Sequence, residues 1–231
     1  MFVPLSDTNP LRSINFQVVT VLLILANIVV FVLQMAPMSP GMVASFAVVP
    51  RELLGDPGVV VPSMDAIAIP EFYTLISYMF LHADVFHLAG NMLFLWVFGD
   101  NVEDAMGHFR FLIFYILCGV GGGLAHALMV PTSASPLVGA SGAVAGVIAA
   151  YLMLHPRVRV WVLAFNIFPI QLTAALLLGF WIVTQVVMVL VPQVGPTAWW
   201  AHIGGFVIGA ILIVFMKKPE FSLFDRDLGS A

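Results

Sequence analysis

Charged residues are scarce in this chain of 231 residues, because Asp, Glu, Lys and Arg together make up only 9% of it. Soluble globular domains carry about 25% charged residues. Hydrophobic residues make up 61% of the chain, well above the roughly 45–50% of soluble domains. The composition therefore excludes a soluble globular protein, and we expect an integral membrane protein.

Cysteine is almost absent, since Cys118 is the single cysteine of the sequence. One cysteine cannot form an internal disulfide, and it suggests neither a redox centre nor a cysteine-based metal site. The sequence also lacks an H-E-x-x-H zinc motif. The formal net charge of −4 is dispersed, with no basic face that would suit nucleic acid. We therefore expect no metal, no cofactor and no nucleic-acid partner.

Long apolar runs are what the chain does have, and a helix of about 20 apolar residues spans a bilayer core of roughly 30 Å. The runs lie at about residues 17–36, 75–99, 109–130, 139–154, 170–191 and 198–216. This pattern predicts an all-α membrane protein, in which six transmembrane helices form the bundle of a single domain over residues 1–231. The apolar segment 161–168 is too short to cross, and we interpret it as interfacial.

The loops between these runs predict how the protein is oriented. Residues 37–71 contain six prolines and three glycines, which indicates a long loop, with a short helix near Pro50. If the N-terminus is cytoplasmic, seven of the eight Lys and Arg residues lie on the inner side, as the positive-inside rule requires. We therefore expect 37–71 to be extracytoplasmic, both termini and the short tail 217–231 to be cytoplasmic, and the membrane to be a prokaryotic plasma membrane.

The motif Gly139-Ala140-Ser141-Gly142 opens the fourth apolar run. A serine between small residues at the start of a helix has an uncrowded hydroxyl, and the unpaired N–H groups of the first turn can hold a negative charge. An acyl-transfer nucleophile needs both properties. The alternative is that small residues at a helix end only allow close packing, so the serine needs partners elsewhere in the chain.

Polar side chains inside apolar runs are costly and therefore suggest function. The same groups can also act as hydrogen-bonding glue between helices, and this is the interpretation we favour for His126. The candidates are His82, His87, Asn91, His126 and His202.

The depth of two candidates matches. Ser141 is 14 residues from His155 and His202 is 15 residues from Lys217, which places them about 21 and 22 Å above the inner boundary at 1.5 Å per residue. The pair Gly142/Gly146 follows the serine, and the pair Gly205/Gly209 follows the histidine at i+3 and i+7, on the same helical face as the histidine. We therefore expect the two helices to approach closely, so that Ser141 and His202 can pair as nucleophile and base.

His87 and Asn91 lie at i and i+4 and so project from one face of the second run. Their N–H groups could bind an oxyanion together with the backbone N–H of Ser141. Counted from Asp100, Asn91 is only about 14 Å up, and it rises by a few ångströms if the helix continues to Glu103.

Taken together, these residues resemble the rhomboid family of intramembrane serine proteases. The resemblance implies a rhomboid-like bundle, with Ser141 as nucleophile, His202 as general base and acid, and His87 with Asn91 organising the oxyanion and water. It also implies single-span membrane proteins as substrates, within the lipid bilayer, and a structural role for Glu103. The motifs that carry it are His87-Leu-Ala-Gly-Asn91, Gly99-x-x-x-Glu103-x-x-x-Gly107, Gly139-Ala-Ser141-Gly142 and Ala201-His202-x-x-Gly205-x-x-x-Gly209.

Two positions are less clear from the sequence. Many rhomboids carry an aromatic residue four positions after the serine, where this chain has Ala145, so the group that orients His202 is left open. Trp199 and Trp200 are interpreted as interfacial anchors, and no carboxylate lies at the depth of the serine, which indicates a dyad. The fifth run has no motif that ties it to the dyad and is our candidate for a lateral gate.

Other functions fit part of the pattern. A catalytically inactive rhomboid-like scaffold that binds transmembrane segments would share the fold, but such relatives characteristically lack the serine or the histidine. A transporter or channel would also place histidines and glycines in the membrane, yet the sequence has no internal repeat and no charged permeation path. The oligomeric state is left open by the sequence.

Overall fold

The computed structural model describes residues 2–35, 40–55, 67, 69–164, 167–191 and 198–224. Two 3₁₀ turns, Glu71–Tyr73 and Tyr78–Phe80, flank the short helix α4 (Thr74–Ser77). The helices in the described part are α1 (Val18–Met35), α2 (Pro40–Ala44), α3 (Pro50–Leu53), α4 (Thr74–Ser77), α5 (Val85–Met106), α6 (His108–Met129), α7 (Ser141–Leu154), α8 (Ala174–Leu190) and α9 (Trp199–Met216). The strands are β1 (Phe2–Asp7), β2 (Arg159–Ala164) and β3 (Phe168–Thr173).

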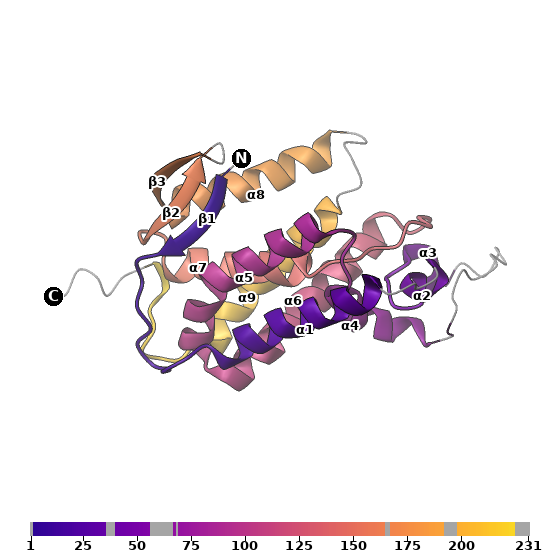
Figure 1. Ribbon diagram of the computed structural model, residues 1–231, viewed down its shortest axis with the longest axis horizontal. Helices are drawn as coiled ribbons and strands as arrows, with labels where there is room; N and C mark the ends of the chain where they lie inside the picture. Colours follow the sequence, from indigo (N-terminus) through magenta and orange to yellow (C-terminus); the bar gives the residue numbers. More distant parts are fainter. Residues whose placement is uncertain are drawn as a thin grey trace.

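The long helices form a bundle around α7 (Figure 1). α6 and α9 pack against α7 and against each other, α5 packs on α7, and α1 packs on α5. α8 lies at the edge of the bundle beside the sheet and contacts α9 and α7. The short helix α3 confirms the helix predicted near Pro50.

Length and apolar composition allow α1, α6 and α9 to cross a membrane. A fourth crossing is possible if the bent pair Glu71–Phe80 and Val85–Met106, which meet at 83°, is one span. Among the described helices, α7 and α8 are apolar but shorter than 18 residues. The protein is thus an integral, multi-pass membrane protein, and the number of six crossings stays a prediction.

The predicted second span, 75–99, is wrong at both ends. The chain bends before α5, where the Asp84 carboxylate accepts hydrogen bonds from the N–H groups of Phe86 and His87 at 2.8 and 2.9 Å. This side-chain cap starts a new helix at Val85. At the other end α5 continues through Glu103 and Asp104 to Met106, so the charges that suggested an inner boundary lie within the helix.

These two carboxylates are buried because they bind backbone N–H groups of the N-terminal segment. Glu103 accepts from Val19 and Thr20 at 2.9 and 2.8 Å, at the start of α1. Asp104 accepts from three successive N–H groups, those of Arg12, Ser13 and Ile14, at 2.7–2.8 Å. Glu103 also contacts His108 Nδ1 at 2.5 Å. Carboxylates can be buried when hydrogen bonds satisfy them in this way, and the structural role expected for Glu103 is confirmed.

The fold is mostly helical, as expected, but it is not all-α, because β1, β2 and β3 form an antiparallel sheet in that order. Residues 161–168, interpreted as interfacial, belong mainly to β2 and the start of β3. The signal was present in β2, where Val160, Val162 and Ala164 alternate with more exposed residues and are buried. Residues 170–173 of the expected fifth span lie in β3, and Thr173 then caps α8 by accepting from Leu176 N–H.

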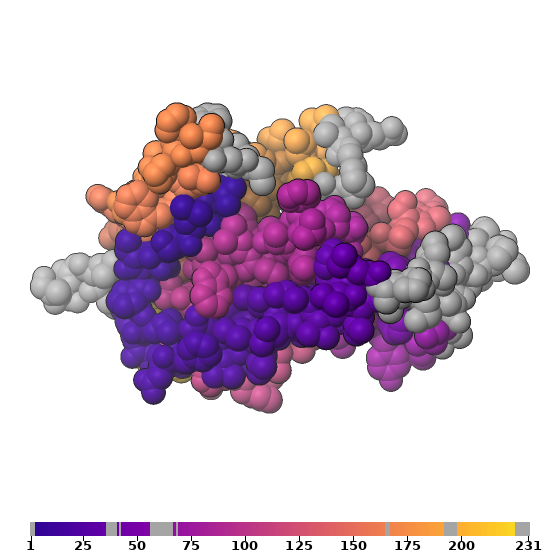
Figure 2. Space-filling model, viewed as in Figure 1, coloured from indigo at the N-terminus to yellow at the C-terminus, as the bar shows by residue number. Residues whose placement is uncertain are grey.

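The partner of β2 on its other side is β1, which lies more than 150 residues earlier in the sequence. The space-filling view shows indigo atoms of the N-terminal segment in contact with orange atoms of the sheet (Figure 2). Phe2 pairs with Ala164 and Asp7 with Val160, with an irregularity between Pro4 and Ser6. The Tyr151 hydroxyl of α7 donates a hydrogen bond to Asp7. Burial raises the pKa of this carboxyl group, against the opposing effect of the Tyr151 hydrogen bond.

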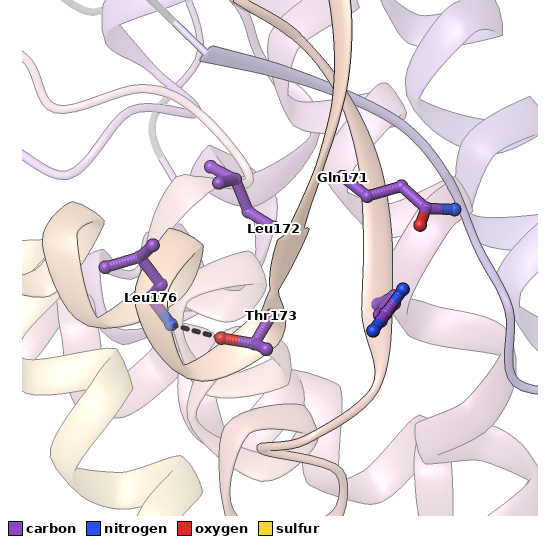
Figure 3. A pocket seen from close by; sticks show the side chains of 5 residues that line it. Gln171, Leu172, Thr173 and Leu176 are labelled. Carbon is purple, nitrogen blue, oxygen red and sulfur yellow. Dashed lines mark hydrogen bonds between the residues drawn. The ribbon is translucent and has the colours of Figure 1, made fainter.

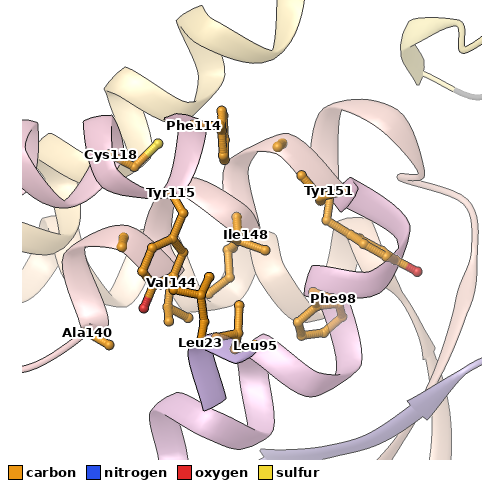
Figure 4. Packing of buried hydrophobic residues seen from close by; sticks show 14 of the residues in the cluster. Leu23, Leu95, Phe98, Phe114, Tyr115, Cys118, Ala140, Val144, Ile148 and Tyr151 are labelled. Atoms are coloured by element: carbon orange, nitrogen blue, oxygen red, sulfur yellow. The ribbon is translucent and has the colours of Figure 1, made fainter. Parts of the chain in front are cut away.

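Large apolar side chains of α1, α5, α6 and α7 meet in one buried cluster (Figure 4). The cluster takes up most of α7, from Ala143 to Leu154, and leaves the start of this helix, at Ser141, for polar contacts. The labelled members are Leu23, Leu95, Phe98, Phe114, Tyr115, Cys118, Ala140, Val144, Ile148 and Tyr151.

The close approach predicted for the fourth and sixth runs is confirmed in α7 and α9. A Cβ atom added to Gly205 would collide with the backbone carbonyl of Gly142, and one added to Gly209 would collide with that of Gly146. The absence of side chains therefore sets how near the two backbones lie.

We expect Gly205→Ala to lower the thermal stability of the detergent-solubilised protein, because its methyl group must push α9 away from α7. Overpacking of this kind typically costs about 1–3 kcal/mol. Gly179→Ala in α8 is the matched control, since a Cβ atom there meets nothing within 4 Å. Equal melting temperatures for the two variants would show that the seam tolerates a side chain.

Candidate active site

Ser141 is the first residue of α7, and His202 lies in the first turn of α9. Their side chains are joined by a hydrogen bond of 2.8 Å between Ser141 Oγ and His202 Nε2. Both are partly buried. The glycine contacts that hold α7 against α9 begin one residue after the serine and three residues after the histidine. The structure thus brings together the two residues that the depth argument paired.

The backbone before Ser141 has a conformation that only glycine adopts easily, with φ = +125° at Gly139. The Gly139 N–H is bound to the carbonyl of Tyr78 at 2.9 Å, which fixes the loop against the turn before α5. The helical hydrogen-bond ladder begins with Val144 N–H to Ala140 O at 2.9 Å. The N–H groups of the first turn, including that of Ser141, therefore precede the ladder and can bind an anion.

His87 and Asn91, both on α5, lie close to Gly139 in this loop. A Cβ atom on Gly139 would be 2.7 Å from His87 Nε2 and 3.8 Å from Asn91 Nδ2. Asn91 is 7% exposed, and its Nδ2 is a buried donor with no hydrogen-bond partner within the described residues. A buried amide donor is costly to leave unpaired, so this group is suited to a negative oxygen that arrives with a ligand.

The longer α5 removes the depth difference that the sequence left for Asn91. This residue is 15 residues before Met106, where α5 ends, which matches the spacing of His202 from Lys217. His126 is not joined to either member of the pair by a hydrogen bond in the described part, and its Nδ1 is buried without a partner. Its interpretation as packing glue therefore stays a prediction.

The sequence argument missed the residue that contacts the other ring nitrogen of His202. Gln185 of α8 places its Oε1 2.7 Å from His202 Nδ1, and it is only 4% exposed. The fifth run is therefore tied to the dyad by a residue that belongs to none of the quoted motifs. An amide inside an apolar run met the criterion applied to the histidines, and Gln185 should have been counted among the candidates.

Two indole rings also flank His202. The Trp181 ring is tilted against the imidazole with centroids 5.8 Å apart, and the Trp199 ring meets it edge-on at 6.0 Å. Trp199 thus contacts the imidazole, and its interpretation as an interfacial anchor stays a prediction. With Ala145 fully buried in α7, the aromatic contacts to the histidine come from α8 and α9.

A pocket at the corner between the sheet and α8 lies outside this region (Figure 3). Its lining residues are Arg159, Gln171, Leu172, Thr173 and Leu176, and none of the four candidate site residues takes part in it. Within the described residues, no group of three or more His, Cys, Asp or Glu side chains is placed to hold a metal ion.

The fold and the site together define the class of protein. It is a membrane protein in which a serine and a histidine from two apolar helices are joined by a hydrogen bond. The family model of the Rhomboid domain matches residues 70–219, which is more than half of the chain. The chain belongs to the rhomboid family.

The sequence of the chain is also similar to those of individual rhomboid proteins. The chain is 34% identical over 157 residues to RHOMBOID-like protein 1 of Arabidopsis thaliana, a match that covers 68% of this chain and 38% of that protein. It is 31% identical over 165 residues to Rhomboid protease GluP of Bacillus subtilis (strain 168), covering 71% of this chain and 30% of GluP. The matched region thus spans less than half of the length of each of these relatives.

We expect Asn91→Ala to lower turnover more than substrate binding, because an oxyanion donor acts mainly on the transition state. Loss of one such donor typically costs about 10²–10³ in rate. Asn101→Ala is the control on the same helix, since the Asn101 amide donates to the Asn9 carbonyl at 3.1 Å, away from the serine. Unchanged kcat in Asn91→Ala would leave His87 and the backbone as the donors.

Proposed function

We propose that this protein is an intramembrane serine endopeptidase that hydrolyses peptide bonds of membrane-spanning substrates through a Ser141–His202 dyad. The observation that carries the proposal is the hydrogen bond of 2.8 Å between Ser141 Oγ and His202 Nε2. Membership of a family that includes a rhomboid protease supports it. A catalytically inactive scaffold is the alternative, and the intact, hydrogen-bonded pair argues against it.

In the proposed reaction, Ser141 gives its proton to His202 Nε2 while Oγ attacks the carbonyl carbon of the scissile bond. The tetrahedral intermediate collapses when the C–N bond breaks and the imidazolium returns the proton to the leaving amine. The acyl group is then bound to Ser141. Water attacks this ester with His202 again acting as base, which releases the new carboxyl end and restores the serine.

The negative oxygen of the intermediate needs donors in place before the reaction starts. We propose that the Ser141 backbone N–H and the Asn91 amide supply them, with His87 beside them. Asn91 Nδ2, which is buried and has no hydrogen-bond partner among the described residues, supports this assignment. The proposed chemistry uses side chains and backbone of this chain alone, with no cofactor and no metal.

The substrates are proposed to be single-span membrane proteins that reach the site from the lipid bilayer. Seven of the eight Lys and Arg residues support an orientation with both termini on the cytoplasmic side, and a prokaryotic plasma membrane is the proposed location. The site would then lie about 8–9 Å below the outer surface. We propose that water reaches it past two loops, 131–138 and 192–197, of which the second lies outside the described residues.

We expect Ser141→Ala and His202→Ala each to reduce cleavage by at least about 10⁴-fold, because both act in one proton transfer. The double variant should lose no more than either single variant. Cleavage of a panel of single-span proteins, offered in detergent and in liposomes, measures the effect. Ser135→Ala, in the exposed part of the loop before α7, is the control and should be as active as wild type.

Full activity of Ser141→Ala would remove the serine mechanism. No cleavage by the wild-type protein across the panel, with the protein folded, would favour the inactive scaffold.

We also expect cleavage near the outer end of a substrate's transmembrane segment, because that is the depth proposed for Ser141. An intact helix shields its peptide bonds, so sites with Gly, Pro or other weak helix formers nearby should be preferred. Mass spectrometry of the product termini locates the cuts. Cuts clustered at the cytoplasmic end would contradict both the orientation and the depth of the site.

A further inference from the structure

The hydrogen bonds of Gln185 fix which atom of its amide faces His202. Its Nε2 lies 3.0 Å from the Trp181 carbonyl oxygen and 3.2 Å from Thr184 Oγ1. A backbone carbonyl can only accept, so the atom facing Trp181 must be the NH₂ group. The Thr184 hydroxyl already donates to the same carbonyl at 2.6 Å, which leaves its oxygen free to accept from Gln185.

The amide orientation in turn fixes the protonation of the histidine ring. Because its NH₂ group faces the Trp181 carbonyl, Gln185 turns its carbonyl Oε1 to His202 Nδ1, at 2.7 Å. A carbonyl oxygen can only accept, so Nδ1 must carry the proton. In a neutral ring Nε2 is then the acceptor, and Nε2 is the atom 2.8 Å from Ser141 Oγ. The chain of donors and acceptors runs without conflict from the Trp181 carbonyl to the serine hydroxyl.

We propose that Gln185 is a positioning residue that holds His202 in the tautomer and ring orientation needed to accept the proton of Ser141. The inference rests on the proposed function and extends it from two residues to three. In serine hydrolases with a triad, a carboxylate performs this task. Here a neutral amide does so, which avoids placing a charge beside the imidazole within the apolar bundle.

The burial of Gln185 supports a specific role. Every residue of α8 is described, and beyond Leu178 the one buried side chain of this helix is Gln185. Apolar residues around it, such as Val183 and Val186, are instead 57% and 46% exposed. A polar side chain is thus the group that α8 turns inward here, and its acceptor reaches the candidate base.

The test compares Gln185→Met with Gln185→Glu in the full-length protein. Met has nearly the length of Gln but only a weak acceptor sulfur, so Nδ1 loses its partner. We expect kcat to fall about 10- to 100-fold with KM within about twofold. The rate at which a fluorophosphonate probe labels Ser141 should fall in the same proportion. A neutral Glu has an O–H in place of the NH₂ and the same carbonyl, so it should restore most of both rates.

Leu178→Ala separates positioning from support of the helix. Leu178 is a fully buried residue of the same helix, and its truncation loosens α8 without touching His202. We expect this variant to lose thermal stability while it keeps its kcat and its labelling rate. If Gln185→Met does not fold, Gln185→Leu provides the same comparison with a different shape.

The outcomes distinguish this inference from the proposed function. Wild-type rates in folded Gln185→Met or Gln185→Leu, or equal losses in Leu178→Ala, would overturn the positioning role and leave the Ser141 mechanism intact. Absence of both cleavage and Ser141 labelling in the wild-type protein would overturn the proposed function and this inference with it.

Discussion

The contact between the backbones of α7 and α9 is the constraint on which the site depends. Where Gly205 faces the Gly142 carbonyl there is no room for a side chain. At this distance, a serine at the start of one helix and a histidine in the first turn of the other can be bridged by one hydrogen bond. In lipid no hydrophobic force draws helices together, so close packing and polar contacts must provide the attachment.

Two groups of polar residues in the described part of the chain matter most for the arrangement of the bundle. In one, the carboxylates of Glu103 and Asp104 bind backbone N–H groups of the N-terminal segment. In the other, Ser141, His202, Gln185 and Asn91 gather at the start of α7 and α9. The apolar cluster lies along α7 between them. The first group anchors the bundle and the second is available for chemistry.

The sequence predicted the parts of the site that follow from helical geometry. Ser141 and His202 were paired by depth and by glycines at fixed spacings, which a regular helix converts directly into position. The bend before α5 was missed because Asp84 acts through a local cap rather than through hydropathy. Gln185 met the criterion for a candidate, as a polar residue in an apolar run. Its partner could not be predicted, because the contact depends on how α8 is rotated against α9, and this rotation follows from tertiary packing that no single run encodes.

The sheet was missed because its pairing is non-local, and this has a consequence for the order of folding. Phe2 pairs with Ala164, so β1 is synthesised before β2 and must wait for it until α7 has been synthesised. Such distant pairing forms slowly compared with helix contacts. α8 begins directly after β3, the last of the three strands in the sequence. The pairing of β3 with β2 therefore also fixes where α8, the helix that carries Gln185, begins. During synthesis, α5, α6 and α7 can therefore pack together before the sheet has formed and before Gln185 of α8 lies beside His202.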